Sequence, residues 1–338
     1  MLKVAILDDY ADAALASADW GILRGQAEIT VFDRHLTEPE AIAALQPFDV
    51  LCTIRERMAL PRTLLERLPN LRLVTIIGRS LANLDMAAAS ELGILIVHPD
   101  FDRPELAKVS AAAPELTWGL IIATVRHIAR ESQRVREGGW QTTAGMILAG
   151  RTLGLLGFGR IGRRMAEYGR AFGMELIAWS QNLTAEAASS VGVRRVEKDQ
   201  LFAEADVLSI HVQLSNRTRG LVTARELALM KPTAYLVNTS RGPIVEEAAL
   251  IEALQQNRIA GAGLDVFDQE PLPPQHPFRT LDNLTATPHL GFATRETLRA
   301  FYADVPAAVA AYAAGAPIRI INTDALSHVK QHGHVAGL

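Results

Sequence analysis

The most constraining feature of this chain is a short apolar run that leads directly into a glycine-rich turn and then into a helical pattern. The run is Thr152–Phe158, and it overlaps the glycine turn GFGRIG at 157–162, which opens the helical stretch RRMAEYGRAFG. In such a turn the first glycine permits a tight bend, the second lets the backbone approach an anion, and the third lets helix and strand pack closely. The helix N-terminus adds unpaired amide groups. We therefore predict a pyrophosphate-binding turn, lined by Gly157, Phe158, Gly159, Arg160 and Ile161.

Short apolar, β-rich runs alternate with helical patterns through most of the 338 residues. This alternation predicts parallel sheets covered by helices. In the first third of the chain the expected strands are KVAILDD, AEITVFD, DVLCTI, LRLVTIIG and ILIVHP, with helices near 39–45 and 61–68. From Arg151 onward the expected strands are TLGLLGF, ELIAWS, VLSIHV, AYLVNTS, GAGLDVF and LTATPH.

The segment between the two series fixes the expected domain organisation. Ala111–Arg130 has a helical pattern with Pro114 in its first turn, and RVREGGWQ after it is typical of a surface turn. A second helical pattern covers Thr294–Ala314. We predict an α/β protein with two doubly wound parallel-sheet domains. A Rossmann nucleotide-binding domain, 112–298, is inserted into a flavodoxin-like substrate domain, 1–111 and 299–330, and 331–338 form a loose tail.

Composition excludes several classes of protein. The net charge of −3 gives no basic surplus, which a general nucleic-acid binder needs to neutralise phosphates. The single cysteine, Cys52, cannot form an intramolecular disulfide, and its strand-like surroundings predict a buried structural thiol. No uninterrupted apolar run reaches the ~18–20 residues that cross a bilayer. We therefore expect a cytoplasmic protein that binds neither nucleic acid nor membrane.

The expected second strand of the nucleotide domain departs from the usual dinucleotide pattern. Such a strand normally ends in an Asp or Glu that bonds the ribose hydroxyls of NAD. Here it ends Ala178-Trp179-Ser180-Gln181-Asn182, with no acid and no Arg or Lys directly after it. We expect Ser180 and Gln181 to contact the ribose. Both NAD and NADP should be accepted, with NAD slightly favoured because a phosphate without a cationic partner is poorly held.

Three later segments each place a polar residue at the end of an expected strand, where doubly wound sheets build their sites. Alone, Arg241 could be a surface cation, Glu270 a loop carboxylate and His289 a loop histidine. Together they match the needs of 2-keto acid reduction. A guanidinium holds the substrate carboxylate, a histidine donates a proton to the carbonyl oxygen, and a carboxylate orients the histidine and favours its protonated form. We take these three residues as the catalytic set.

From the glycine turn to His289 the chain resembles the D-isomer-specific 2-hydroxyacid dehydrogenase family. The matching stretches are GRTLGLLGFGRIGRRMA, ELALMKPTAYLVNTSRGPIVEEAALIEAL, IAGAGLDVFDQEPLP and NLTATPHLGFAT, with NLDMAAASELGI and PELTWGLI upstream. The resemblance implies that Arg241 binds substrate, that His289 is the acid/base and that Glu270 is its partner. It also implies that Asp265 holds the nicotinamide carboxamide. The further cofactor contacts expected are His211, Val212, Thr218, Thr239, Ser240, Arg241, His289 and Gly291.

Three departures from the family pattern affect the expected sites, the first two in the substrate site and the third in the adenine pocket of the cofactor. The carboxylate-binding loop reads GRSLANLD at 78–85 where the family usually has glycine, so the amides of Ser80 and Leu81 are expected to bind substrate beside bulkier side chains. The connection at 98–114 is longer than usual, and Gln213 replaces a typical proline. Arg55 and Arg57 match cations that bind acidic substrates in phosphoglycerate dehydrogenase, but a solvated Arg-Glu-Arg surface run explains them equally well.

Other interpretations stay open at this point. The corepressors that resemble this family act as dinucleotide-sensing interaction proteins, but they carry disordered Pro/Ser-rich tails, and this chain does not. A phosphite-type oxidoreductase on the same scaffold would use the same residues. Three histidines near the C-terminus could bind a metal, but LSHVKQHGHVAGL is more typical of a loose tail, and we expect no metal site. The expected partners are a small 2-hydroxy or 2-keto acid and a second copy of the chain, as a homodimer.

Overall fold

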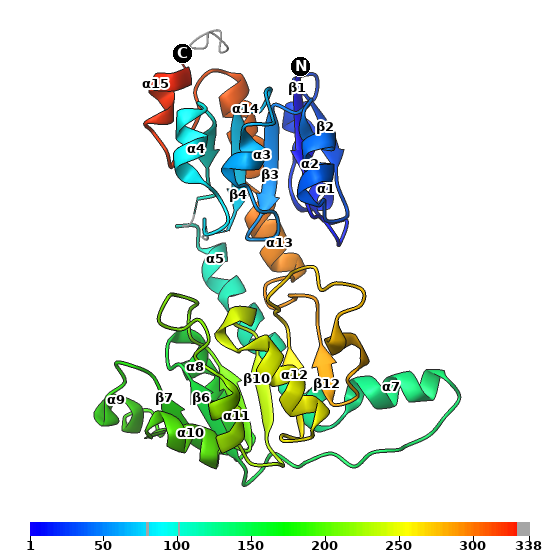
Figure 1. Ribbon diagram of the computed structural model, residues 1–338. Helices are drawn as coiled ribbons and strands as arrows, with labels where there is room; N and C mark the ends of the chain where they lie inside the picture. The colour runs from blue at the N-terminus through cyan, green and yellow to red at the C-terminus, as the bar shows by residue number, and fades with distance from the viewer. Residues whose placement is uncertain (79–80, 101, 330–338) are drawn as a thin grey trace. The chain divides into compact units, whose positions relative to one another are not determined.

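The computed structural model describes residues 1–78, 81–100 and 102–329. The chain forms two compact units, one of Met1–Ser110 with Thr294–Leu338 and one of Ala111–Ala293 (Figure 1). The second junction therefore lies at 293/294, and not at the expected 298/299. The predicted tail, 331–338, lies outside the described residues.

The first unit is built on a 5-stranded sheet with the order β2-β1-β3-β4-β5. All neighbouring strands are parallel, and this order is the flavodoxin-like one. The strands are β1 (Leu2–Ile6), β2 (Ala27–Val31), β3 (Val50–Ile54), β4 (Leu73–Ile77) and β5 (Leu95–Val97). Every residue of β3 and β4 is buried, which explains why these two strands are apolar throughout.

Short helices cover this sheet and connect its strands. They are α1 (Ala14–Ser17), η1 (Trp20–Leu23), α2 (Glu38–Leu45), α3 (Arg62–Leu65), α4 (Met86–Glu91), α5 (Glu105–Lys108), α13 (Arg295–Tyr302), α14 (Val305–Ala313) and α15 (Ala325–Val329). Thr37 begins α2 with a capping box shared with Glu40. Cys52 is fully buried in β3, and burial raises the pKa of its thiol to about 12, so the predicted buried thiol is confirmed.

The second unit contains a 7-stranded parallel sheet with the order β12-β11-β10-β9-β6-β7-β8. Counted from β6, the first six strands have the order 3-2-1-4-5-6 of a dinucleotide-binding sheet, and β12 extends it by one strand. The strands are β6 (Thr152–Leu156), β7 (Glu175–Trp179), β8 (Arg194–Arg195), β9 (Val207–Ile210), β10 (Tyr235–Asn238), β11 (Gly261–Leu264) and β12 (Leu284–Ala286).

Helices lie on both faces of this sheet, and α7 (Ile128–Arg136) extends away from it, as Figure 1 shows. The other helices of this unit are α6 (Ala112–Val125), α8 (Arg160–Ala171), α9 (Ala185–Ser189), α10 (Lys198–Glu204), α11 (Ala224–Leu229), η3 (Gly242–Ile244), α12 (Glu247–Gln255) and η4 (Pro277–Thr280). Side chains alternate between two cores because successive residues of a strand point to opposite faces. Leu155 packs with residues of α6 and α8, whereas Leu156 packs with residues of α10 and α12.

Several expected local features need correction. The helix predicted for Ala111–Arg130 ends at Val125, because His127 takes a left-handed conformation (φ 54°) and a new helix, α7, begins after it. Helix α7 runs to Arg136, so the first three residues of the predicted turn RVREGGWQ are helical. Strand β8 was not predicted, because a two-residue strand shows no periodicity. Helix α15 takes in Leu326–Val329, so LSHV is not part of a loose tail.

One stretch, Glu105–Val125, is long and apolar enough to cross a membrane by length and composition alone. Core helices of soluble proteins pass the same test, so this observation is weak evidence for a membrane span. Within the stretch, α6 packs against α8, β10, β11 and β12. These contacts explain its apolar composition as that of a core helix.

Candidate active site and dinucleotide site

The glycine turn between β6 and α8 requires glycine at two positions. Gly157 has φ +103°, and a Cβ there would lie 2.7 Å from the carbonyl carbon of His211 and 2.8 Å from the amide nitrogen of Val212. A Cβ on Gly162 would lie 2.3 Å from the oxygen of Gly157. By contrast, a Cβ on Gly159 would meet nothing within 4 Å. The backbone at Gly159 is therefore open at the N-terminus of α8, and this cradle fits a dinucleotide pyrophosphate.

The other predicted residues of this turn differ in how far their side chains are exposed to solvent. Phe158 is buried in the core, and Ile161 packs against the same core cluster. Arg160 is exposed at the first position of α8. Phe158 and Ile161 can therefore meet a ligand chiefly through their backbones, whereas the Arg160 side chain is accessible.

Ser180 and Gln181 form a turn directly after β7, where Leu183 N donates to Ser180 O at 3.0 Å.

The side chain of Arg195, a cation that the sequence analysis did not single out, lies beside this turn. Arg195 of β8 donates from Nε to Leu183 O at 3.0 Å. In the sequence Arg195 stands 16 residues after Trp179, the end of the second strand, so the local pattern there gave no sign of it. The sequence signal was the basic pair in VGVRRVE, between Val193 and Val196, both buried.

His211 and Val212 follow β9, and their backbone lies against Gly157 of the glycine turn. Their contact with the cofactor stays a prediction. His211 Nε2 lies 2.9 Å from Ser209 Oγ, and burial lowers the pKa of His211 to about 3. His211 is therefore a neutral ring near neutral pH. Thr218 has mainly local partners, since its Oγ1 donates to Gln213 O at 2.5 Å and accepts from Ser215 N at 2.8 Å. Thr218 thus closes the loop that follows Val212.

The turn after β10 presents Thr239, Ser240 and Arg241. Thr239 Oγ1 lies 2.7 Å from Thr117 Oγ1 of α6, and Ser240 Oγ donates to Val212 O at 2.5 Å. Asn238, which was not predicted as a site residue, closes the turn from inside. Its Oδ1 accepts from Ser240 N at 3.0 Å, and its Nδ2 donates to Arg241 O at 2.9 Å.

Arg241 is joined to the other two catalytic candidates through one close backbone contact. A Cβ on the next residue, Gly242, would lie 2.1 Å from the carbonyl carbon of Phe267, so the two backbones touch. Phe267 N in turn donates to Glu270 Oε1 at 2.9 Å. Arg241 is partly exposed, and its Nη1 donates to Ser240 O at 2.6 Å.

Glu270 and His289 form a tight pair. Glu270 Oε2 lies 2.5 Å from His289 Nδ1, and the side chains are 32% and 19% exposed. With Nδ1 held by the carboxylate, Nε2 is the ring nitrogen available for proton exchange with a substrate. The ring also contacts Phe292 edge-on, with 5.9 Å between centroids. The geometry therefore suits a general acid/base whose ring orientation is fixed.

Asp265 holds the segment that carries His289. Its Oδ1 accepts from Thr287 Oγ1 at 2.6 Å and from Leu290 N at 2.7 Å, and its Oδ2 accepts from Gly291 N at 2.8 Å. The residue is fully buried, and burial raises the pKa of its carboxyl group despite these bonds. Both carboxylate oxygens thus bond protein groups on either side of His289. The carboxamide contact implied by the resemblance stays a prediction.

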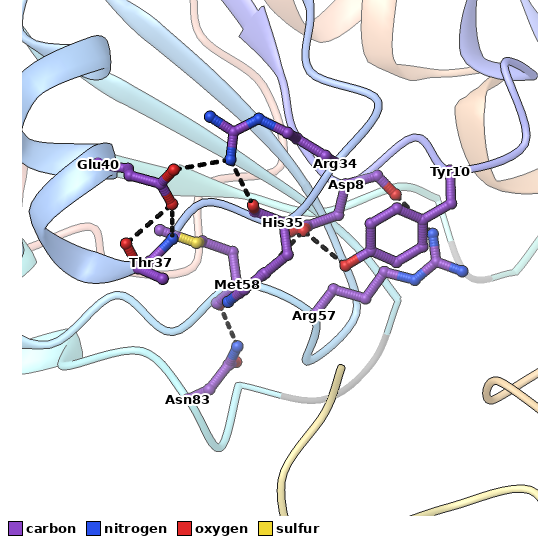
Figure 2. A network of polar contacts seen from close by, with 9 residues as sticks. All are labelled: Asp8, Tyr10, Arg34, His35, Thr37, Glu40, Arg57, Met58 and Asn83. Carbon is purple, nitrogen blue, oxygen red and sulfur yellow. Dashed lines mark hydrogen bonds and ion pairs between the residues drawn. The ribbon is translucent and has the colours of Figure 1, made fainter. Parts of the chain in front are cut away.

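The substrate-site residues predicted in the first unit lie after β3 and β4. Arg55 has φ 53° and pairs with Glu56 at 3.4 Å. Arg57 donates from Nη1 to Asp8 O at 2.6 Å and lies 4.5 Å over the Tyr10 ring, as Figure 2 shows. Leu81 packs against the core of this unit, and Ser80 lies outside the described residues. Both arginines therefore have partners within their own unit.

Among the described residues there is no group of three or more His, Cys, Asp or Glu side chains that could hold a metal ion. The side chains at the strand ends that can bind an anion and exchange a proton are those of Arg241, Glu270 and His289. The sheet order and the glycine turn define the class of the second unit as that of a dinucleotide-binding domain.

Comparison with known proteins places the chain more narrowly. Residues 118–291 match the D-isomer specific 2-hydroxyacid dehydrogenase, NAD binding domain family. A glyoxylate reductase of Aeropyrum pernix is 41% identical over 243 residues, covering 69% of this chain and 71% of that protein. A hydroxypyruvate reductase of Thermotoga maritima is 36% identical, covering 82% and 89%. The chain belongs to the D-isomer-specific 2-hydroxyacid dehydrogenase family.

A longer relative and two solved structures extend the comparison. The D-3-phosphoglycerate dehydrogenase of Methanocaldococcus jannaschii is 35% identical to this chain, and the match covers 89% of this chain but only 55% of the longer relative. Phosphoglycerate oxidoreductase of Vibrio cholerae is 34% identical with a TM-score of 0.85, covering 94% and 100%. D-lactate dehydrogenase of Aquifex aeolicus, solved with NAD and lactic acid, is 25% identical with a TM-score of 0.69, covering 94% and 99%. Both solved structures support the α/β fold of this chain.

Proposed function

We propose that this protein reduces a small 2-keto acid to the 2-hydroxy acid with NADH or NADPH, and catalyses the reverse oxidation. The observation that carries the proposal is the Glu270–His289 pair, 2.5 Å apart, joined to Arg241 through the contact between Gly242 and Phe267. A bound reduced dinucleotide supplies the hydride to the carbonyl carbon. The glycine turn, whose backbone is open at Gly159, would hold its pyrophosphate, and the 180–183 turn its ribose.

The chain's own residues bind the acid and move the proton. The Arg241 guanidinium holds the substrate carboxylate by paired hydrogen bonds and polarises the adjacent carbonyl. His289 donates its Nε2 proton to the carbonyl oxygen, which becomes the hydroxyl group of the product. Glu270 accepts from Nδ1 throughout, so the ring keeps its orientation before and after the transfer. In oxidation the same ring takes the proton back.

The first test is a substrate screen with purified protein. Glyoxylate, hydroxypyruvate and pyruvate, each with NADH and NADPH, are followed by loss of nicotinamide absorbance. The names of two relatives, glyoxylate reductase and hydroxypyruvate reductase, make the first two acids the leading candidates. Turnover of any 2-keto acid separates an enzyme from a dinucleotide-sensing interaction protein. No turnover of any acid would contradict the proposal.

Substituting Arg241 tests the proposed carboxylate contact. A lysine keeps the charge but loses the planar fork. Arg241→Lys should therefore lose ~3 kcal/mol or more of transition-state stabilisation, which lowers kcat/KM by more than about a hundredfold. Arg258→Lys is the matched control, because Arg258 is a 44%-exposed arginine that pairs with Glu252 on the surface. A lysine variant at position 241 with near-wild-type kcat/KM on every accepted acid would rule out the assigned role.

A further inference from the structure

The edge of the nucleotide sheet contains a cation beside the turn where the ribose is expected. Strand β8 pairs in parallel with β7, with Arg195 opposite Ala178, two residues before Ser180. The Arg195 Nε donates to Leu183 O at 3.0 Å, and Leu183 N closes the turn on Ser180 O at 3.0 Å. Parallel strands end at the same edge of a sheet, so the guanidinium lies against the 180–183 turn.

The neighbouring charges leave this guanidinium able to take an anion. It is 33% exposed, and its Nη1 pairs with Glu197 Oε1 at 2.7 Å, a carboxylate that is 71% exposed. Ion pairs of that exposure contribute only about 0–1 kcal/mol, so a phosphate can compete with Glu197. An arginine has five N–H donors, and the bonds to Leu183 and Glu197 use only two of its nitrogens. The turn itself, Ser180-Gln181-Asn182, has no carboxylate that would repel a phosphate.

We propose that Arg195 binds the 2′-phosphate of NADP(H), so that this site holds NADPH at least as well as NADH. The proposal rests on the proposed dinucleotide site but not on the identity of the keto acid. It reverses the slight NAD preference expected from sequence, because that expectation assumed that no cation lies near the turn. Glu197 opposes the effect, since its charge competes with the phosphate for the same guanidinium.

Three single substitutions test the pair by direct binding, without turnover. Dissociation constants for NADH, NADPH and adenosine 2′,5′-bisphosphate are measured by calorimetry for Arg195→Gln, Glu197→Gln and the control Arg194→Gln. Arg194 is the adjacent residue on β8 but pairs with Glu204. Neither Arg195 nor Glu197 is buried, and Glu197 makes no side-chain cap for α10, so these variants should fold.

The three variants should behave differently. In Arg195→Gln, binding of NADPH and of the bisphosphate should weaken at least tenfold, while NADH binding changes less than twofold. In Glu197→Gln, NADPH should bind two- to fivefold tighter with NADH unchanged, and Arg194→Gln should match wild type. Unchanged NADPH binding in Arg195→Gln, or an equal loss for both dinucleotides, would overturn the proposal while leaving the proposed function intact. A wild-type protein that binds no dinucleotide would overturn both.

Discussion

At the scale of single residues, the orientation of His289 depends on groups that do not exchange its proton. Its backbone takes φ 54°, an uncommon conformation for a residue with a side chain. Asp265 accepts hydrogen bonds from Thr287 and Leu290, which lie on either side of it in the chain, and Glu270 holds Nδ1 at 2.5 Å. Strained conformations persist where the surroundings hold them, and here they are held by one buried and one half-exposed carboxylate. The ring is therefore preorganised before any substrate binds.

Substitutions of this pair separate its two roles. His289→Ala should lower the rate ~10²–10⁴-fold, the usual loss when a positioned acid/base is removed, with little change in NADH affinity. Glu270→Gln keeps a polar contact to Nδ1 but removes the carboxylate that bonds both His289 Nδ1 and Phe267 N. Keto-acid reduction should therefore slow about tenfold or more with NADH affinity unchanged, because a less firmly oriented ring transfers its proton less effectively. The measurement is kcat for the keto acid together with the dissociation constant of NADH, and a wild-type kcat in Glu270→Gln would disprove the coupling.

At the scale of elements, the strand-end turns place the catalytic side chains. The turn after β10 is closed by Asn238, which is 1% exposed and bonds both Ser240 N and Arg241 O. Ser240 Oγ ties the same turn to Val212 O. The direction in which Arg241 leaves the strand is thus set by hydrogen bonds within the turn and to the next loop. Asn238 is a positioning residue for Arg241.

Removing the Asn238 side chain should therefore act through Arg241. Asn238→Ala removes the acceptor of Ser240 N and one of two donors to Arg241 O, which keeps its bond from Ile244 N at 3.3 Å. The loss of such hydrogen bonds costs ~1–3 kcal/mol of stability. In the fully folded variant, KM for the keto acid should rise about tenfold or more. Asn238→Asp keeps the acceptor for Ser240 N and should recover part of the loss. If KM in folded Asn238→Ala equalled the wild-type value, Asn238 would have only a structural role.

The elements that carry strong local patterns could be predicted from sequence. The buried strands, the glycine turn and the segments with Arg241, Glu270 and His289 lie where the pattern of apolar runs put them. Strand β8 could not be found because two residues carry no period, and with it Arg195 was missed. The break at His127 was missed because a left-handed histidine has no sequence signature of its own. The role of Asn238 depends on bonds that only folding brings together.

At the scale of the whole molecule, one segment of the second unit exposes several large apolar side chains. None of the residues of α7 is buried in the part of the chain that the structure describes, and in Figure 1 the helix and the chain after it extend away from the sheet. The segment 128–147 exposes Ile128 (49%), Val135 (56%), Trp140 (80%) and Ile147 (74%). Large exposed apolar side chains gathered in one segment mark an interaction surface.

We propose that this segment pairs with the same segment of a second copy, giving the expected homodimer. A twofold interface places one surface against itself, so a segment with charges of both signs can be self-complementary. Helix α7 meets this condition, because Glu131 lies among Arg130, Arg134 and Arg136. The apolar side chains would form the centre of the interface, with these charges at its rim.

Placing a charge at the centre of this segment should separate the subunits. Trp140→Lys would bury an unpaired ammonium in the dimer, and unpaired buried charges are strongly unfavourable. Light scattering coupled to size-exclusion chromatography should give twice the chain mass for wild type and the chain mass for Trp140→Lys. Leu15→Lys is the matched control, since Leu15 is 50% exposed in the other unit and its substitution should leave the dimer intact. A wild-type protein that stays monomeric at tens of micromolar, or a dimer unaffected by Trp140→Lys, would contradict an interface through 128–147.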